Sequence, residues 1–106
     1  MAKKQGKVKP VFTPKGTRQL EDIITSIIKR QIRKKGLIKT GRLINSIDTK
    51  LFFDSRNVAT ITITAVYYFE FLMWRYNVLE DAFGTSEFQD VLELIGRFNI
   101  NYNFIE

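Results

Sequence analysis

The side chains most often used in catalysis and metal binding are missing from this chain, because its 106 residues include no cysteine and no histidine. Disulfides and the usual zinc sites are therefore excluded. Catalysis would need a Ser-Lys pair or clustered carboxylates. Glu80 and Asp81 are neighbours that point apart on a predicted helix, and Asp48 and Asp54 fall at a strand end and a turn. The sequence predicts no enzyme, no cofactor, no metal site and no small-molecule substrate.

Phosphate binding is the one chemistry that the basic residues favour. Residues 1–50 contain 14 Lys and Arg against 3 Asp and Glu, whereas residues 51–106 contain 3 against 8, so the two halves carry +11 and −5. The candidate phosphate contacts are Lys29, Arg30, Arg33, Lys34 and Arg42. A structural interpretation competes with this one, because a basic cluster also complements the negative end of a helix. Thr40-Gly41-Arg42 alone lacks the spacing of a phosphate-binding loop.

Residues 1–16 are predicted to form an extended basic arm, since they contain five lysines, two prolines and two glycines but no acid. An arm of this length reaches about 50 Å when extended, which is enough to contact a neighbouring subunit. Its candidate contact residues are Lys3, Lys4, Lys7, Lys9, Val11 and Phe12. A solubilising tail is the alternative interpretation.

The remaining residues, 17–106, are predicted to form a single α+β domain in which a long N-terminal helix and later helices pack on a small antiparallel sheet. The first helix runs from about Thr17, its N-cap, to Lys35, and Gly36 suits the position after its end. Glu21 and Asp22 then complement the positive end of the helix. The apolar face of this helix consists of Leu20, Ile23, Ile24, Ile27, Ile28 and Ile32.

Three further elements follow the basic helix. Thr40 is predicted to cap a short helix that buries Leu43, Ile44 and Ile47. Alternating residues then predict a hairpin with its turn at residues 54–57 and with Ala59, Ile61, Ile63 and Ala65 on the core face of its second strand. Residues 99–106 alternate in the same way and are expected to join its sheet with one wet face. Between them, Ser86 begins a capping-box pattern ahead of a helix that buries Phe88, Val91, Leu92, Ile95 and Phe98.

The most aromatic segment, residues 66–83, is predicted to be one helix after Tyr67. Apolar residues occupy both of its sides, so it needs burial on two sides, either inside the core or at a subunit interface. The candidate interface residues are Tyr67, Tyr68, Glu70, Phe71, Trp74 and Arg75.

Two motifs in this order resemble the tail-completion, or head-tail joining, proteins of tailed bacteriophages. The first is Thr40-Gly41-Arg42-Leu43 with Ser46-Ile47 before alternating strands, and the second is Tyr67-Tyr68-Phe69-Glu70-Phe71. The resemblance covers roughly residues 17–98. One departure is that the Gly-Thr pair, which in that family follows closely on the Glu-Phe, comes here only at Gly84-Thr85.

The resemblance implies a non-catalytic virion protein of the neck, assembled in the host cytoplasm as a ring of identical subunits. Its partners would be other copies of itself, the portal or connector proteins, the tail proteins and the passing DNA. Opposite charges on the two halves are compatible with a ring, which needs different complementary patches on the two sides of each subunit. The alternative is a small basic nucleic-acid-binding protein. No apolar run is long enough to cross a membrane, and no signal peptide is apparent.

Overall fold

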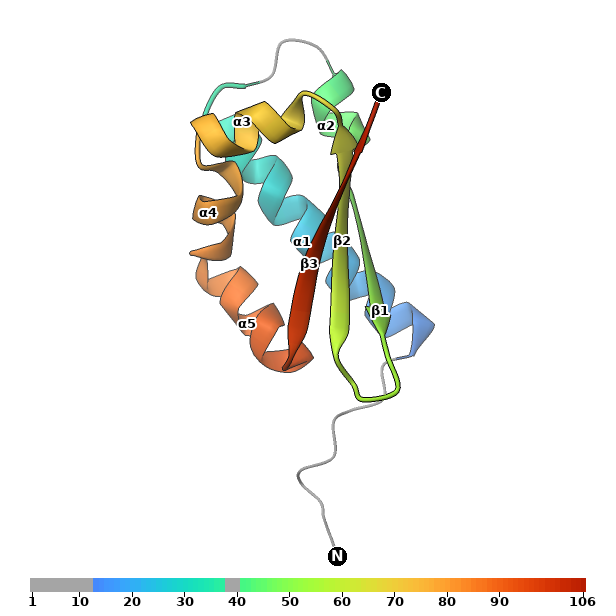
Figure 1. The fold of residues 1–106 in the computed structure, drawn as a ribbon. Coiled ribbons are helices and arrows are strands. Elements are labelled where there is room, and N and C mark those ends of the chain that lie inside the picture. Colours follow the sequence, from blue (N-terminus) through green and yellow to red (C-terminus); the bar gives the residue numbers. More distant parts are fainter. Residues whose placement is uncertain (1–12, 38–40) are drawn as a thin grey trace, which may run out of the picture.

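The computed structural model describes residues 13–37 and 41–106. Figure 1 shows a small sheet with the longest helix across one face and a column of three shorter helices along one side. The helices are α1 (Pro14–Lys34), α2 (Arg42–Ser46), α3 (Phe69–Arg75), α4 (Val78–Phe83) and α5 (Ser86–Ile95). The strands are β1 (Asp48–Phe53), β2 (Ala59–Val66) and β3 (Phe98–Ile105), in the order β1-β2-β3. The predicted α+β class and the long first helix are confirmed.

The first helix starts earlier than the sequence predicts, so Thr17 is not its N-cap and residues 14–16 do not belong to an arm. Thr13 is the cap, and its hydroxyl accepts a hydrogen bond of 3.0 Å from the Gly16 N–H. Pro14 is tolerated at the first position because the N–H that it lacks would have no partner inside the helix. At the other end Gly36 has φ +68°, as predicted.

The core lies between α1, the sheet and the three helices α3, α4 and α5, which connect β2 to β3. On α1, Leu20, Ile24, Ile27, Ile28 and Ile32 are buried as predicted, whereas Ile23 is exposed and Gln31 is buried. The buried residues of α2 and β2 also follow the prediction: Leu43, Ile44 and Ile47, and then Ala59, Ile61, Ile63 and Ala65. Because α1 contacts β1 on one side and α4 and α5 on the other, it ties the two halves of the chain together.

The hairpin is confirmed, but the sheet is mixed rather than antiparallel. β1 pairs with β2 antiparallel, whereas β3 pairs with β2 in parallel, with Ile61 opposite Ile100. A parallel pair needs a crossover connection, and α3, α4 and α5 provide it by returning the chain to the end of the sheet where β2 begins. Alternation along residues 98–105 predicts a strand but carries no information about its direction.

The aromatic segment is two helices and not one, because Asn77 adopts the left-handed conformation with φ +54° and ends α3. Asparagine tolerates this conformation better than other residues with a side chain. The predicted capping box at Ser86 is also wrong by one residue. Thr85 caps α5 instead, and its hydroxyl accepts a hydrogen bond of 3.2 Å from the Phe88 N–H.

A side chain of α1 occupies one backbone donor at the outer edge of β1. The prediction that Glu21 lies at the positive end of the helix is wrong, because the first turn contains no acid. Glu21 lies beside β1, where its carboxylate accepts a hydrogen bond of 2.8 Å from the Leu51 N–H. A second hydrogen bond, of 2.8 Å, joins Thr25 Oγ1 to Thr49 Oγ1. These contacts fix α1 on β1 and satisfy a backbone donor at the edge of the sheet.

We expect Glu21→Ala to lower the free energy of unfolding by about 1–3 kcal/mol, because it removes a charged acceptor and leaves the partly buried Leu51 N–H without a partner. The neighbouring exposed acid, Asp22, provides the matched control. Urea denaturation of the Asp22→Ala variant should show a change of less than about 0.5 kcal/mol. An equal loss in the two variants would contradict this role of Glu21.

The hairpin turn contains a carboxylate, Asp54, that should make the stability of the fold depend on pH in the acid range. The Asp54 carboxylate accepts hydrogen bonds from the N–H groups of Val58 and Arg56, and these bonds hold the pKa of Asp54 below its usual value. Since the folded state favours the charged form, this stabilisation is complete above the unfolded pKa of about 3.9 and is lost as the pH falls through the lower folded pKa. Denaturation at a series of pH values below neutrality measures the free energy of unfolding. This free energy should fall less steeply with decreasing pH for Asp54→Asn than for the wild type.

Candidate assembly surface

The candidate interface residues gather around α3, where large apolar side chains are exposed. Trp74 is 71% exposed and Phe71 61%, while Phe69 and Met73 on the opposite side of α3 are buried. The helix therefore has one face in the core, and its other face presents two aromatic rings to the solvent. Exposed aromatic residues in a cluster are typical of protein interfaces. The residues Tyr67, Phe71, Trp74, Arg75 and Tyr76 are called the α3 surface below.

Cationic side chains lie against the rings of this region. The Arg75 guanidinium is 5.9 Å from the ring centroid of Phe71 and 6.0 Å from that of Tyr76. Such contacts hold an arginine over an aromatic face while its polar edge remains available to a partner. Glu70 is exposed in the first turn of α3, so an acid lies on the same helix as the α3 surface and its Arg75.

The two motifs that carry the phage resemblance meet in space. Arg42 of the first motif lies over the rings of Tyr67 and Tyr68 of the second, with its guanidinium carbon 5.9 Å from each centroid. Ser46 joins α2 to β2, because its hydroxyl donates to the Leu43 carbonyl and accepts a hydrogen bond of 2.9 Å from the Val66 N–H. The first motif is thus a structural joint that holds Arg42 next to the α3 surface. The prediction that Thr40 caps this helix is wrong, because Gly41 is at the N-cap position of α2 and makes no side-chain cap. Thr40 itself lies outside the described residues.

An apolar hollow adjoins the α3 surface on the side of α2. Its volume is about 590 Å³, and its walls include Leu37, Leu43, Tyr68, Phe71, Leu72 and Tyr76. Phe71 and Tyr76 therefore belong both to the exposed surface and to the rim of the hollow. An apolar side chain of a partner would find a preformed recess here.

Two of the five candidate phosphate contacts, Arg30 and Arg42, lie against groups of the chain itself. Arg30 pairs with Glu87 of α5, and this hydrogen-bonded ion pair raises the pKa of Arg30 and lowers that of Glu87. Lys35 pairs with Asp81 of α4. Arg42, the fifth candidate, contacts the tyrosine rings instead of joining the cluster.

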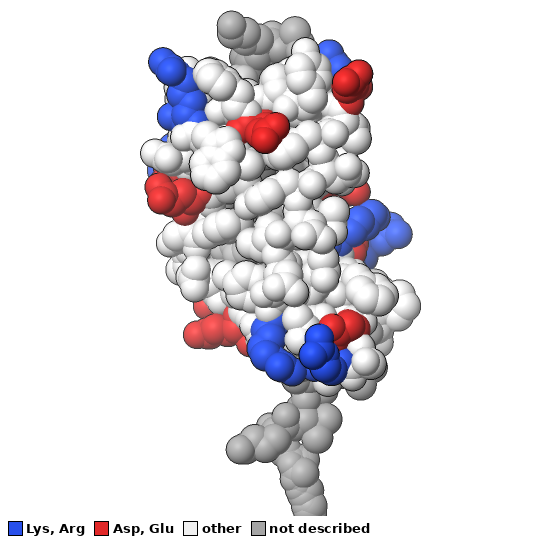
Figure 2. Space-filling model, viewed as in Figure 1, with Lys and Arg blue, Asp and Glu red and all other residues white. Residues whose placement is uncertain are grey.

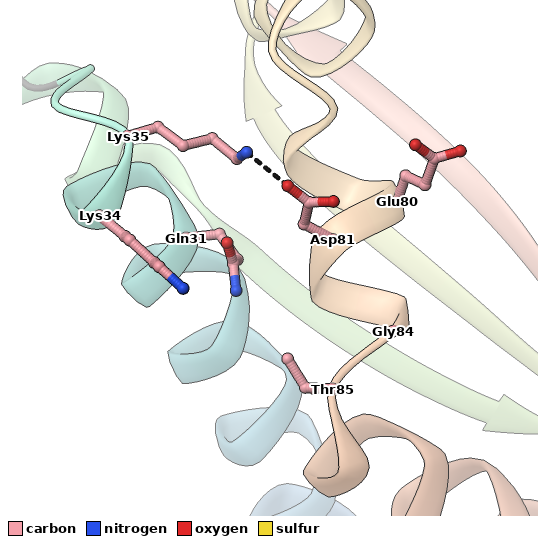
Figure 3. Close-up of a pocket in the computed structure, with 7 residues that line it drawn as sticks. All are labelled: Gln31, Lys34, Lys35, Glu80, Asp81, Gly84 and Thr85. Carbon is pink, nitrogen blue, oxygen red and sulfur yellow. Dashed lines mark hydrogen bonds and ion pairs between the residues drawn. The ribbon is translucent and has the colours of Figure 1, made fainter.

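A hollow of about 520 Å³ separates the end of α1 from α4 and the start of α5 (Figure 3). Figure 3 shows Lys34 and the buried Gln31 pointing into it, with the Lys35–Asp81 ion pair across one end and Glu80 pointing away. Of the four charged residues in its walls, Glu80 points away and Lys35 and Asp81 pair with each other, so Lys34 is the one that remains. A single lysine is a weak signal for an anion such as phosphate.

The sheet leaves its other face open, and that face carries little charge. The side chains that β2 and β3 present there are Thr60, Thr62, Thr64, Asn99, Asn101 and Asn103. Figure 2 shows an uncharged central area with charged residues towards its ends and sides. A face of this composition is a poor binding surface for a phosphate backbone, which needs Lys and Arg.

The predicted arm contacts, Lys3, Lys4, Lys7, Lys9, Val11 and Phe12, lie outside the described residues. Within the described part of the chain, no group of three or more Asp and Glu residues is placed to hold a metal ion, and no helix is long and apolar enough to cross a bilayer. Comparisons of the chain with protein-family models, curated proteins and solved structures found no match.

Proposed function

We propose that this chain is a structural protein of a bacteriophage neck, forming a ring that joins the head or portal connector to the tail. The observation that carries the proposal is the α3 surface, in which a domain with a complete core exposes Phe71 and Trp74 side by side. A second support is the contact between the two motifs that resemble the tail-completion family, through Arg42 and the adjacent tyrosines.

A cyclic ring needs two different surfaces on each subunit, one to present and one to receive. The α3 surface is the first, and the basic arm is the proposed second. Charge complementarity between whole halves of the chain is reduced, because Arg30 and Lys35 already pair with acids of the second half within one subunit. Residues 1–12 contribute four lysines and no acid to the basic charge that remains for assembly.

Nucleic-acid binding is the competing function, and a salt titration separates the two. We expect the purified chain to release duplex and single-stranded DNA at about 0.15 M salt, because Arg30 and Lys35 are already paired with acids of the chain itself. Retention of DNA at that salt, with loss on replacing Lys29, Arg33 and Lys34 together by alanine, would favour the nucleic-acid-binding protein. The same assay on a variant that lacks residues 2–12 measures the contribution of the arm.

A further inference from the structure

The two edges of the sheet differ in their availability to a partner strand. At the edge of β1, the Leu51 N–H is occupied by the Glu21 carboxylate at 2.8 Å. At the other edge lies β3, whose eight residues include no charge, no proline and no glycine. Those are the features that natural proteins use to protect an open edge. The β3 edge is therefore the one that can accept another strand.

The hydrogen-bond pattern shows which groups of β3 face outwards. Ala59 donates to the Arg97 carbonyl at one end of the pair, and Tyr67 donates to the Ile105 carbonyl at the other. In a parallel ladder alternate residues bond to the same neighbour, so the odd-numbered residues of β3 bond to β2. The N–H and C=O groups of Ile100, Tyr102 and Phe104 consequently point towards the open edge. No other strand of the described chain pairs with them.

A hollow lies beside this edge on the face of the sheet that the helices cover. Its volume is about 250 Å³, and its walls include Met73, Trp74, Leu79, Glu80, Phe83 and Tyr102. Tyr102 belongs to both the strand and the hollow. A strand added along β3 would place alternate side chains next to Tyr102 and so into this recess. The recess suits one small apolar side chain, with Glu80 available for a nearby cation.

The N-terminal arm matches this site in charge and pattern. Residues 4–9 read Lys-Gln-Gly-Lys-Val-Lys, with one apolar residue between two lysines. Residues 69–106, which surround β3, contain seven acids against two arginines. We propose that residues 4–9 of one subunit add to β3 of a neighbouring subunit as a fourth strand, with Val8 in the hollow and Lys7 and Lys9 beside Asn101 on the open face. The contact rests on the proposed ring and specifies how its subunits are joined.

The geometry favours a neighbouring subunit over the same one. Figure 1 shows α1 beginning on the β1 side of the sheet, whereas β3 is the opposite edge. The four Cα–Cα steps from Lys9 to the Thr13 cap span about 14 Å at full extension. Reaching a fourth strand from β1 requires three strand spacings, or about 14 Å in a straight line, so a link within one subunit would have to be fully extended and could not bend around the sheet. Exchange of arms between subunits removes this constraint and makes every contact in the ring equivalent.

Engineered disulfides test the contact in the full chain, because the natural sequence contains no cysteine. One variant carries Lys7→Cys or Lys9→Cys, and a second, larger tagged variant carries Asn101→Cys. After mixing and mild oxidation, we expect a disulfide-linked heterodimer on a non-reducing gel. The control partner carries Lys50→Cys, which is exposed on the open face of β1. Linkage to Asn101→Cys should exceed linkage to this control by at least about tenfold, because docking raises the local concentration.

Two substitutions of opposite charge at the exposed Asn101 should change the linkage of the arm in opposite directions. We expect Asn101→Lys to reduce linkage of the arm to a cysteine at Asn103 about threefold and Asn101→Glu to increase it similarly, with equal melting temperatures. The strand addition would be overturned by equal linkage in the Asn101→Lys and Asn101→Glu variants, or by equal linkage to Lys50→Cys. A disulfide formed only within one chain would also overturn it. If closed rings form but the disulfide does not, the strand addition is wrong and the neck function is not affected. If the chains are linked but never close into a ring, the neck function is contradicted and the strand addition is not affected.

Discussion

Replacing Phe71 and Trp74 together by serine is expected to abolish ring assembly while leaving the subunit folded. The two side chains are 61% and 71% exposed, so they contribute little to the core of one subunit. In an interface, buried aromatic residues of this kind cost about 2 kcal/mol or more when truncated, which corresponds to about a 30-fold weaker contact for each residue. Mass photometry or size-exclusion chromatography measures the loss of assembly, and thermal denaturation measures the fold.

A matched control uses exposed apolar residues on other surfaces. Phe52 on β1 is 67% exposed and Leu94 on α5 is 53% exposed. The Phe52→Ser, Leu94→Ser double variant removes a similar amount of exposed apolar surface away from α3. We expect it to assemble as the wild type does. Assembly that survives the loss of Phe71 and Trp74, or that fails equally in the control, would show that the α3 surface is not the interface.

The largest expected loss of stability comes from Ile24→Ala. Ile24 is 0% exposed in the centre of α1, so the variant loses buried apolar surface and leaves a cavity, which costs about 2–5 kcal/mol. The adjacent Ile23 is 41% exposed, and Ile23→Ala should change the free energy of unfolding by less than about 1 kcal/mol. Urea denaturation of both variants measures the difference. Similar losses would mean that α1 does not pack on β1, α4 and α5 as described.

The elements of this fold could be predicted from the sequence where periodic burial determines them. One face of α1, the inner face of β2 and the short helix α2 follow from apolar spacing, and all three are confirmed. Ile23 was the exception on α1, because an apolar stripe identifies a face but not its limits. The buried Gln31 lies three and four residues after Ile28 and Ile27, so the helical spacing places it on the buried face and only its polar side chain argues against burial.

Features that depend on contacts between distant residues were beyond the sequence. The parallel direction of β3 is decided by the path of three helices, and alternation along the strand is the same in either direction. Glu21 was assigned to the dipole of its own helix, but its partner is a backbone N–H thirty residues away. The start of α1 differs from the prediction because Pro14 and Gly16 are residues typical of irregular segments, although both are compatible with the first turn of a helix.

The candidate site was predicted in part. Composition identifies the aromatic segment but not its break at Asn77. Phe71 and Trp74 face outwards because α3 buries Phe69 and Met73 on its other side, and the break separates α3 from α4, which returns to the core. The phosphate candidates were chosen by charge alone. Their ion pairs with α4 and α5 arise from the packing of α1, which sequence spacing does not reveal.

The most direct test of the ring is electron microscopy of the purified full-length chain, combined with native mass spectrometry at high protein concentration. The account predicts closed rings of a single copy number, which the Phe71→Ser, Trp74→Ser variant fails to form. A chain that remains a monomer at every concentration would contradict a ring-forming neck protein.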